Sequence, residues 1–242
     1  MDLCEIPVGS ASPRELLAEL FHALNQPLAA LRCSCELALL APRTVEQYRN
    51  YLQTALQKTE QASLLARGIR ELLEAEEEGD EENGALQVLP LREQVREAAE
   101  YFLPAAAEAG TTLCLDCDGD SPADDSLVDF HPENLRRALF YIFDCLLPMA
   151  RGEKIKINVE NSSSQVTLHL SFPAANGDAE ENHSPQDHNQ QNHWQPKLQW
   201  AIAQKLFRAR QGNLVMTCHD GQLCVQASLP VAETVPCTPQ SR

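Results

Sequence analysis

The sequence predicts an α+β protein, with an antiparallel helical hairpin followed by an α/β sandwich. Residues 13–73 carry long apolar repeats at spacings of three and four, while residues 85–230 alternate helical patterns with strands of period two. Between them, residues 74–82 hold seven carboxylates in nine positions, a composition typical of a solvated linker. We therefore expect two domains, at residues 10–78 and 85–230.

Composition limits the classes of partner. The 242 residues have a formal net charge of -16, which argues against nucleic acid or an anionic membrane as the main partner. No apolar run approaches the roughly 18 residues of a membrane span, and the first residues lack the basic and apolar regions of a signal peptide. We expect a cytoplasmic protein whose nine cysteines are reduced core thiols rather than a disulfide framework.

The first helix is expected from Pro13 to about Ala41. Ser12 and Glu15 form a capping box around Pro13, and Pro42 ends the helix. Pro27 has no N–H to donate, so we expect a kink one turn after His22. The predicted apolar seam comprises Leu17, Phe21, Leu24, Leu28, Leu31, Cys35 and Ala38.

A second helix should start after a very short turn. Thr44 and Gln47 form a second capping box, so the two helices must be antiparallel. A two-helix hairpin alone cannot bury both seams, and we expect a homodimer that forms a four-helix bundle. The second seam comprises Val45, Tyr48, Leu52, Ala55, Thr59, Ala62, Ala66, Ile69 and Leu73.

The remaining elements follow from periodicity and turn residues. Residues 161–164 and the pair Asp220-Gly221 are typical of hairpin turns, and residues 176–195 read as a polar loop. Helices are expected over residues 91–109, 132–149 and 196–210. Strands are expected near residues 86–89, 111–116, 126–130, 154–160, 165–172, 213–218 and 222–229.

The segment from His22 to Leu28, which reads HALNQPL, resembles the phosphoacceptor box HELNQPL of bacterial sensor histidine kinases at six of seven positions. The resemblance covers nearly the whole chain. It implies a dimerisation and histidine phosphotransfer hairpin, followed by a histidine-kinase-type ATPase-like domain. Residues 130–139 are similar to the approach to the asparagine box of that domain, and residues 198–206 to its final helix.

The sequence departs from active kinases at the positions that handle nucleotide. Tyr141 and Cys145 stand where the asparagine box presents its amides, although magnesium needs oxygen ligands. The aspartate and alternating glycines expected after residue 172 are missing, and Gly177 is the single glycine between Gly152 and Gly212. Ala23 replaces the acid that would accept the imidazole proton. We expect ATP and magnesium binding to be lost.

The resemblance therefore implies a histidine-containing phosphotransfer protein of a two-component phosphorelay. His22 would be the phosphoacceptor, Gln26 occupies the position of an amide or hydroxyl used in dephosphorylation, and Asn25 is a further candidate in the same box. The expected partners are response-regulator receiver domains, which would supply the magnesium, and a second copy of the chain. No cofactor is expected.

Two other functions remain open from the sequence, a divergent but active sensor kinase and a non-catalytic module that binds a regulator. His22 also fits a surface histidine on an amphipathic helix. We expect no metal site, although two weak candidates exist. These are the pair Cys114 and Cys117, and the trio His183, His188 and His193.

Overall fold

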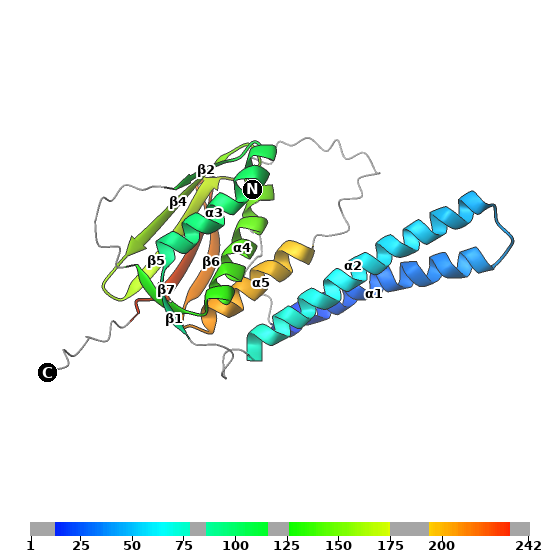
Figure 1. The fold of residues 1–242 in the computed structure, drawn as a ribbon, viewed down its shortest axis with the longest axis horizontal. Helices are drawn as coiled ribbons and strands as arrows, with labels where there is room; N and C mark the ends of the chain where they lie inside the picture. The colour runs from blue at the N-terminus through cyan, green and yellow to red at the C-terminus, as the bar shows by residue number, and fades with distance from the viewer. Residues whose placement is uncertain (1–12, 78–85, 116–125, 175–193, 233–242) are drawn as a thin grey trace, which may run out of the picture.

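The computed structural model describes residues 13–77, 86–115, 126–174 and 194–232. Helix α1 (Pro13–Leu39) and helix α2 (Val45–Glu77) form an antiparallel hairpin that projects away from the rest of the chain (Figure 1). The Thr44 Oγ1 atom accepts the Gln47 N–H at 3.2 Å, and the Gln47 side chain accepts the Thr44 N–H at 3.1 Å. The predicted capping box at the start of α2 is therefore confirmed.

Helix α1 runs through Pro27 without interruption, and the proline is buried in the hairpin. The helix begins at Pro13 as predicted, while Ser12 lies outside the described residues. A proline can remain inside a helix when tertiary packing offsets the hydrogen bond that it removes. Burial of Pro27 within the hairpin is consistent with that compensation.

The α/β part contains seven strands and three helices among the described residues, in the predicted order. The boundaries agree with the sequence prediction to within a few residues. The elements are β1 (Gln87–Pro90), α3 (Leu91–Glu108), β2 (Thr112–Leu115), β3 (Leu127–Phe130), α4 (Pro132–Met149), β4 (Lys154–Asn161), β5 (Gln165–Pro173), α5 (Trp194–Arg208), β6 (Asn213–His219) and β7 (Gln222–Pro230).

The strands form a five-stranded sheet of order β2-β4-β5-β7-β6 and a small β1-β3 pair. Only β2 and β4 are parallel among the described pairs, and the others are antiparallel. Asp220 and Gly221, with φ of 50° and 72°, make the tight turn between β6 and β7. The predicted α+β sandwich is confirmed.

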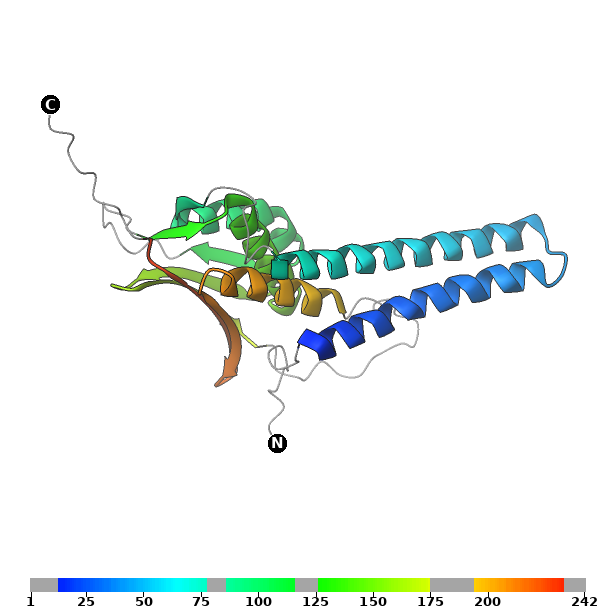
Figure 2. The same cartoon turned by 90° about the horizontal axis from the view of Figure 1, so that it is seen from below.

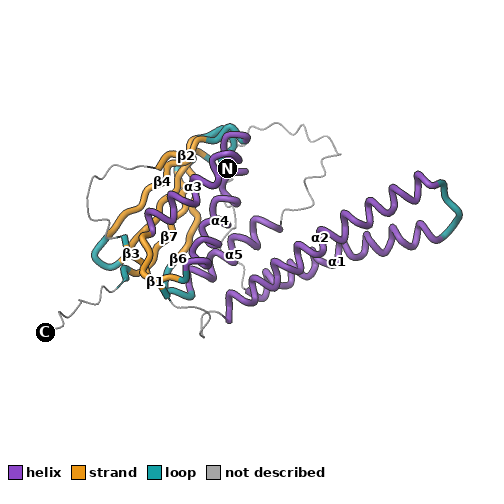
Figure 3. Tube along the Cα trace, viewed as in Figure 1, coloured by secondary structure: helices purple, strands orange, loops and turns teal. Residues whose placement is uncertain are grey.

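Helices α3, α4 and α5 cover one face of the large sheet (Figures 2 and 3). Alternate residues of β5 are buried toward these helices, which is the pattern of an antiparallel sheet with one covered face. The helices contribute a matching apolar side, with α4 providing fully buried residues to the core. Those with no exposed surface are Leu135, Ala138, Leu139, Ile142, Phe143 and Leu146.

The predicted hairpin seams are buried only in part in the single chain. The buried hydrophobic residues of the hairpin are Leu20, Ala23, Ala62, Leu65, Ile69 and Leu72, of which only Ala62 and Ile69 belong to the predicted seams. Much of the predicted stripe is exposed instead, including Phe21 and Leu28 on α1 and Tyr48 and Leu52 on α2. The reason is that the apolar arc of each helix is wider than one partner helix covers. The sequence pattern did not indicate which part of the arc faces inward.

None of the described helices has an apolar stretch long enough to cross a membrane.

The sequence predicts that the cysteines are reduced. Cys33, Cys35, Cys114, Cys145 and Cys224 are free thiols, although Cys33 and Cys35 are exposed rather than in the core. The expectation that the cysteines are reduced therefore holds for these five. It is wrong for Cys218, which is disulfide-bonded. Cys218 lies on the edge strand β6 and is partly buried.

Candidate functional site

The three residues predicted from the acceptor box share one exposed face of α1. His22, Asn25 and Gln26 are all exposed, and residues three and four apart are neighbours on a helix surface. Helix α1 therefore brings the imidazole and both amides together in a position that a second protein can approach.

Ala23 faces the protein interior instead of solvent. It is 9% exposed and belongs to the hydrophobic core that includes Leu20 and Leu65. Its methyl group cannot accept a proton, so this position provides no general base for the imidazole.

Helix α5 joins the hairpin to the α/β part at three points. The Lys197 ammonium lies 2.7 Å from a Glu19 carboxylate oxygen on α1. The Lys205 ammonium donates to the Leu72 carbonyl at 3.3 Å. Leu198 packs on Gly68 so closely that a Cβ atom at Gly68 would overlap it. In Figure 2, α5 lies beside the hairpin at the end nearer the sheet.

Tyr141, at one of the two asparagine-box positions, makes a fourth contact with the hairpin. Its hydroxyl donates to the Glu71 carboxylate on α2. Burial raises the pKa of Tyr141 well above its ordinary value, and the hydrogen bond and negative charge of Glu71 raise it further. The phenol is therefore neutral at physiological pH and keeps the proton that it donates to Glu71.

Cys145, at the other asparagine-box position, is buried against the first turn of α5. Its thiol lies 3.3 Å from the Pro196 carbonyl, to which it donates. Burial, with a smaller contribution from the charge of Asp144, raises the pKa of Cys145 to about 12. The neighbouring Gln199 amide donates to Asp144 at 2.6 Å. This part of α4 is therefore occupied by contacts with α5.

These two positions do not fit a magnesium-nucleotide site. Magnesium prefers several oxygen ligands in octahedral geometry. The Tyr141 phenol is engaged with Glu71, and Cys145 offers a buried neutral thiol. Within the described ranges no group of three or more His, Cys, Asp and Glu residues is arranged to hold a metal ion. Cys117, His183, His188 and His193 lie outside the described residues.

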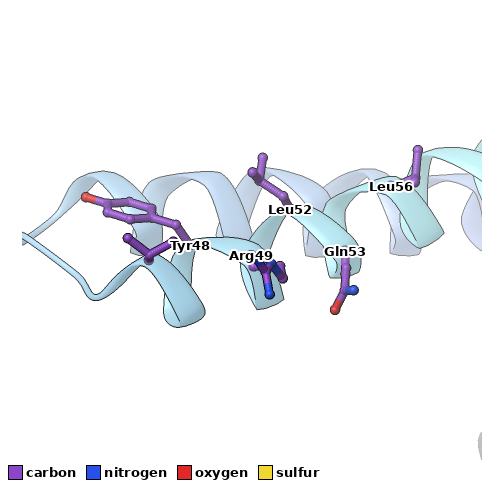
Figure 4. A pocket seen from close by; sticks show the side chains of 6 residues that line it. Tyr48, Arg49, Leu52, Gln53 and Leu56 are labelled. Atoms are coloured by element: carbon purple, nitrogen blue, oxygen red, sulfur yellow. The ribbon is translucent and has the colours of Figure 1, made fainter.

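An exposed apolar pocket lies on α2 near the hairpin turn. It has a volume of about 400 Å³ and is shown in Figure 4. Three of its lining residues belong to the predicted seam, and the others were not predicted. The lining residues are Val45, Tyr48, Arg49, Leu52, Gln53 and Leu56.

The contacts between hairpin and α/β part were not predicted from the sequence. Tyr141 and Glu71 are 70 residues apart, and Lys197 and Glu19 are 178 residues apart. Gly68 inside a long helix was the one local signal, because an interior glycine is unfavourable in a helix without a packing reason.

The chain was compared with known proteins. No protein-family model matches it. It is 24% identical over 154 residues to the sensor protein IrlS of Burkholderia pseudomallei, a match that covers 64% of this chain and 32% of IrlS. The chain thus spans about a third of the length of that relative.

Solved structures give a fuller match. The histidine kinase AdeS of Acinetobacter baumannii has a TM-score of 0.58 at 16% identity, covering 87% of this chain and 98% of that chain. Histidine kinase ThkA, in complex with the response regulator TrrA, has a TM-score of 0.61 at 16% identity, covering 90% and 61%. Full-length ShkA in complex with AMPPNP has a TM-score of 0.54 at 15% identity, covering 92% and 46%. In sequence the chain is similar to the sensor protein IrlS, and in fold it is similar to histidine kinases of known structure.

Proposed function

We propose that this chain is a histidine-containing phosphotransfer protein, which passes phosphoryl groups between response-regulator aspartates and His22 without using ATP. The observation that carries the proposal is a combination of two features. His22 is exposed on the hairpin, whereas the asparagine-box positions Tyr141 and Cys145 are engaged in protein contacts. The acceptor is accessible, and these two positions do not offer ligands for a nucleotide-bound magnesium ion.

The proposed step needs only a nucleophile from this chain. The unprotonated ring nitrogen of a neutral His22 attacks the phosphorus of an aspartyl phosphate, and an N–P bond forms. The P–O bond to the aspartate breaks, and its electron pair returns to the aspartate as a carboxylate. The other ring nitrogen keeps its proton. The reverse reaction delivers the phosphoryl group to a second receiver, and in both directions the receiver holds the magnesium.

The neighbouring amides suggest a second activity at the same face. Gln26 lies one turn after His22 and is exposed. Its amide can orient a water molecule toward a phosphoryl group on either protein, which favours dephosphorylation. We assign this role to Gln26, with Asn25 as the adjacent polar contact.

We also propose that the chain acts as a homodimer with a four-helix bundle. Val45 is 78% exposed and Leu52 is 70% exposed, although both lie on an apolar stripe of α2. Exposed apolar stripes of this kind mark interaction surfaces, and a second hairpin would cover them with its own stripe. The complex of ThkA with the response regulator TrrA supports a receiver domain as the other partner.

The test uses receiver domains from the source organism, each phosphorylated with labelled acetyl phosphate. We expect at least one receiver to label the wild-type chain within minutes and His22→Gln and His22→Ala to take no label. His219→Gln is a matched control, because His219 is exposed and lies on β6, outside the hairpin. Label that persists in both His22 variants would contradict the proposal.

Incubation with labelled ATP and magnesium separates the remaining alternatives. Acid-labile self-labelling at His22 would identify a divergent active kinase. Receiver binding that survives His22→Ala, with no transfer in either direction in the wild type, would identify a non-catalytic binding module. We expect neither result.

A further inference from the structure

The ion pair between Lys197 and Glu19 lies one helical turn from the proposed phosphoacceptor. Glu19 precedes His22 by three residues on α1, so the two side chains are neighbours on the helix surface. Helical side chains lean toward the N-terminus of their helix. The His22 and Glu19 side chains therefore extend in the same direction from adjacent turns of α1, and the Lys197 ammonium lies 2.7 Å from the Glu19 carboxylate.

The pair is also open to a phosphoryl group. The side chain of Lys197 is 43% exposed and that of Glu19 is 41% exposed. Neither group is locked into a buried network, and an exposed pair of this kind is only weakly stabilising. A lysine side chain has a flexible four-carbon stem and can exchange one anion for a nearby one.

Phosphorylation of His22 would change the charges at this turn. A phosphoryl group brings up to two negative charges next to the Glu19 carboxylate, and like charges one turn apart repel each other. A dianionic phosphoryl group is also a stronger acceptor for an ammonium group than a single carboxylate. No acidic residue lies in the first turn of α5, from which Lys197 extends.

We propose that Lys197 is a phosphoryl-binding residue for His22, supplied by the ATPase-like part of the chain. In the unmodified protein its ammonium group pairs with Glu19, and in the phosphorylated protein it pairs with the phosphoryl group. The inference rests on the proposed function, since it assumes that His22 carries a phosphoryl group. It also gives α5 a role in phosphotransfer that does not need nucleotide.

The test uses potassium phosphoramidate as a chemical phosphodonor, so no receiver domain is needed. The unprotonated nitrogen of His22 attacks phosphorus, an N–P bond to the imidazole forms, and the bond to the amine breaks with release of ammonia. The rate of loading at His22 is followed by peptide mass spectrometry at neutral pH. Loading of the exposed His219 in the same sample serves as an internal reference.

Four variants distinguish a phosphoryl-binding role from a structural one. We expect Lys197→Ala to slow the loading of His22 roughly three- to tenfold, and Lys197→Arg to stay within about twofold of wild type. Glu19→Gln should speed loading, because it removes the competing carboxylate. Lys154→Ala is the matched control, since Lys154 is an exposed lysine on β4. Lys197→Ala and Glu19→Gln both remove the ion pair, so any change in folding stability should have the same sign in the two variants. Opposite changes in the loading rate of His22 therefore cannot result from altered stability.

The outcomes also separate this inference from the proposed function. Equal loading of His22 in wild type, Lys197→Ala and Glu19→Gln would overturn the role of Lys197, as would a failure of phosphoramidate to load His22 at all. Neither result depends on a receiver domain. If phosphoramidate loading follows the expected order but no receiver transfers to His22, the proposed function fails and the anion site at Lys197 stands.

Discussion

The Tyr141 hydroxyl on α4 donates a hydrogen bond to the Glu71 carboxylate on α2. This bond connects the α/β part to the hairpin at a position where the sequence resemblance leads one to expect an asparagine. Together with the contacts of α5, this hydrogen bond holds the hairpin against the α/β part.

Tyr141→Phe should weaken the connection between the two parts without disturbing the core of either. The phenyl ring keeps its packing, while the Glu71 carboxylate loses its donor, a loss of about 1 kcal/mol for a half-buried hydrogen bond. We expect differential scanning calorimetry to show a lower or broadened unfolding transition. Tyr101→Phe is the control, because Tyr101 is 63% exposed on α3. Equal thermograms for the two variants would contradict a role for the hydroxyl in joining the parts.

The raised pKa of Tyr141 makes stability depend on pH in the alkaline range. In the unfolded chain a tyrosine loses its proton near pH 10, whereas in the folded chain the pKa is higher. The contribution is therefore complete below pH 10 and is lost as the pH rises from 10 toward the folded pKa. We expect the free energy of unfolding to fall more steeply above pH 10 in wild type than in Tyr141→Phe, as measured by urea denaturation. Parallel curves would show that Tyr141 does not have a raised pKa.

The effect of Gly68→Ala on stability should depend on the residue at position 198, and it should change sign when Leu198 is replaced by alanine. In the wild type the new Cβ overlaps Leu198, so we expect a loss of about 1 to 3 kcal/mol from overpacking. In a Leu198→Ala background the overlap is gone, and the better helix propensity of alanine should stabilise α2 by up to about 1 kcal/mol. A double-mutant cycle by thermal denaturation measures the coupling. Additive effects would mean that α5 does not pack on Gly68 in solution.

Leu52→Glu should dissociate the proposed dimer. Leu52 lines the apolar pocket on α2, and a carboxylate there would have to be buried without a partner in a four-helix bundle. We expect sedimentation velocity to show a dimer for wild type and a monomer for the variant. Leu39→Glu is a matched control, since Leu39 is 85% exposed at the end of α1 and does not line the pocket. A wild-type monomer at micromolar concentration would contradict the proposed dimer.

The sequence predicted those features that depend on local interactions. The cap at Thr44 and Gln47 and the turn at Asp220-Gly221 are set by residues that contact each other within a few positions, and both are present. The strand boundaries follow from the alternation of apolar and polar residues.

The features that sequence reasoning missed depend on packing between distant segments. The choice of the stripe through Leu20 and Leu65 over the one through Phe21 was not visible, because both stripes are apolar and the choice depends on how the two helices are rotated against each other. The partners of Tyr141 and Lys197 lie on other helices, and no local pattern identifies them. Tyr141 departs from the kinase pattern in the sequence itself, but its contact with Glu71 joins residues 70 positions apart and has no local signal.

Helix α2 carries one set of residues toward α1 and another toward α4 and α5, so the rotational phase along its 33 residues links the two interfaces. One residue inserted between Leu56 and Gly68 would turn everything beyond it by about 100°. Gly68 and Glu71 would then leave Leu198 and Tyr141, and Lys197 would be drawn away from the turn that holds His22. An insertion of seven residues nearly restores the phase. That insertion would still move Gly68 and Glu71 by about 10 Å along α1, so the length of α2 fixes both the angle and the position at which α5 approaches His22.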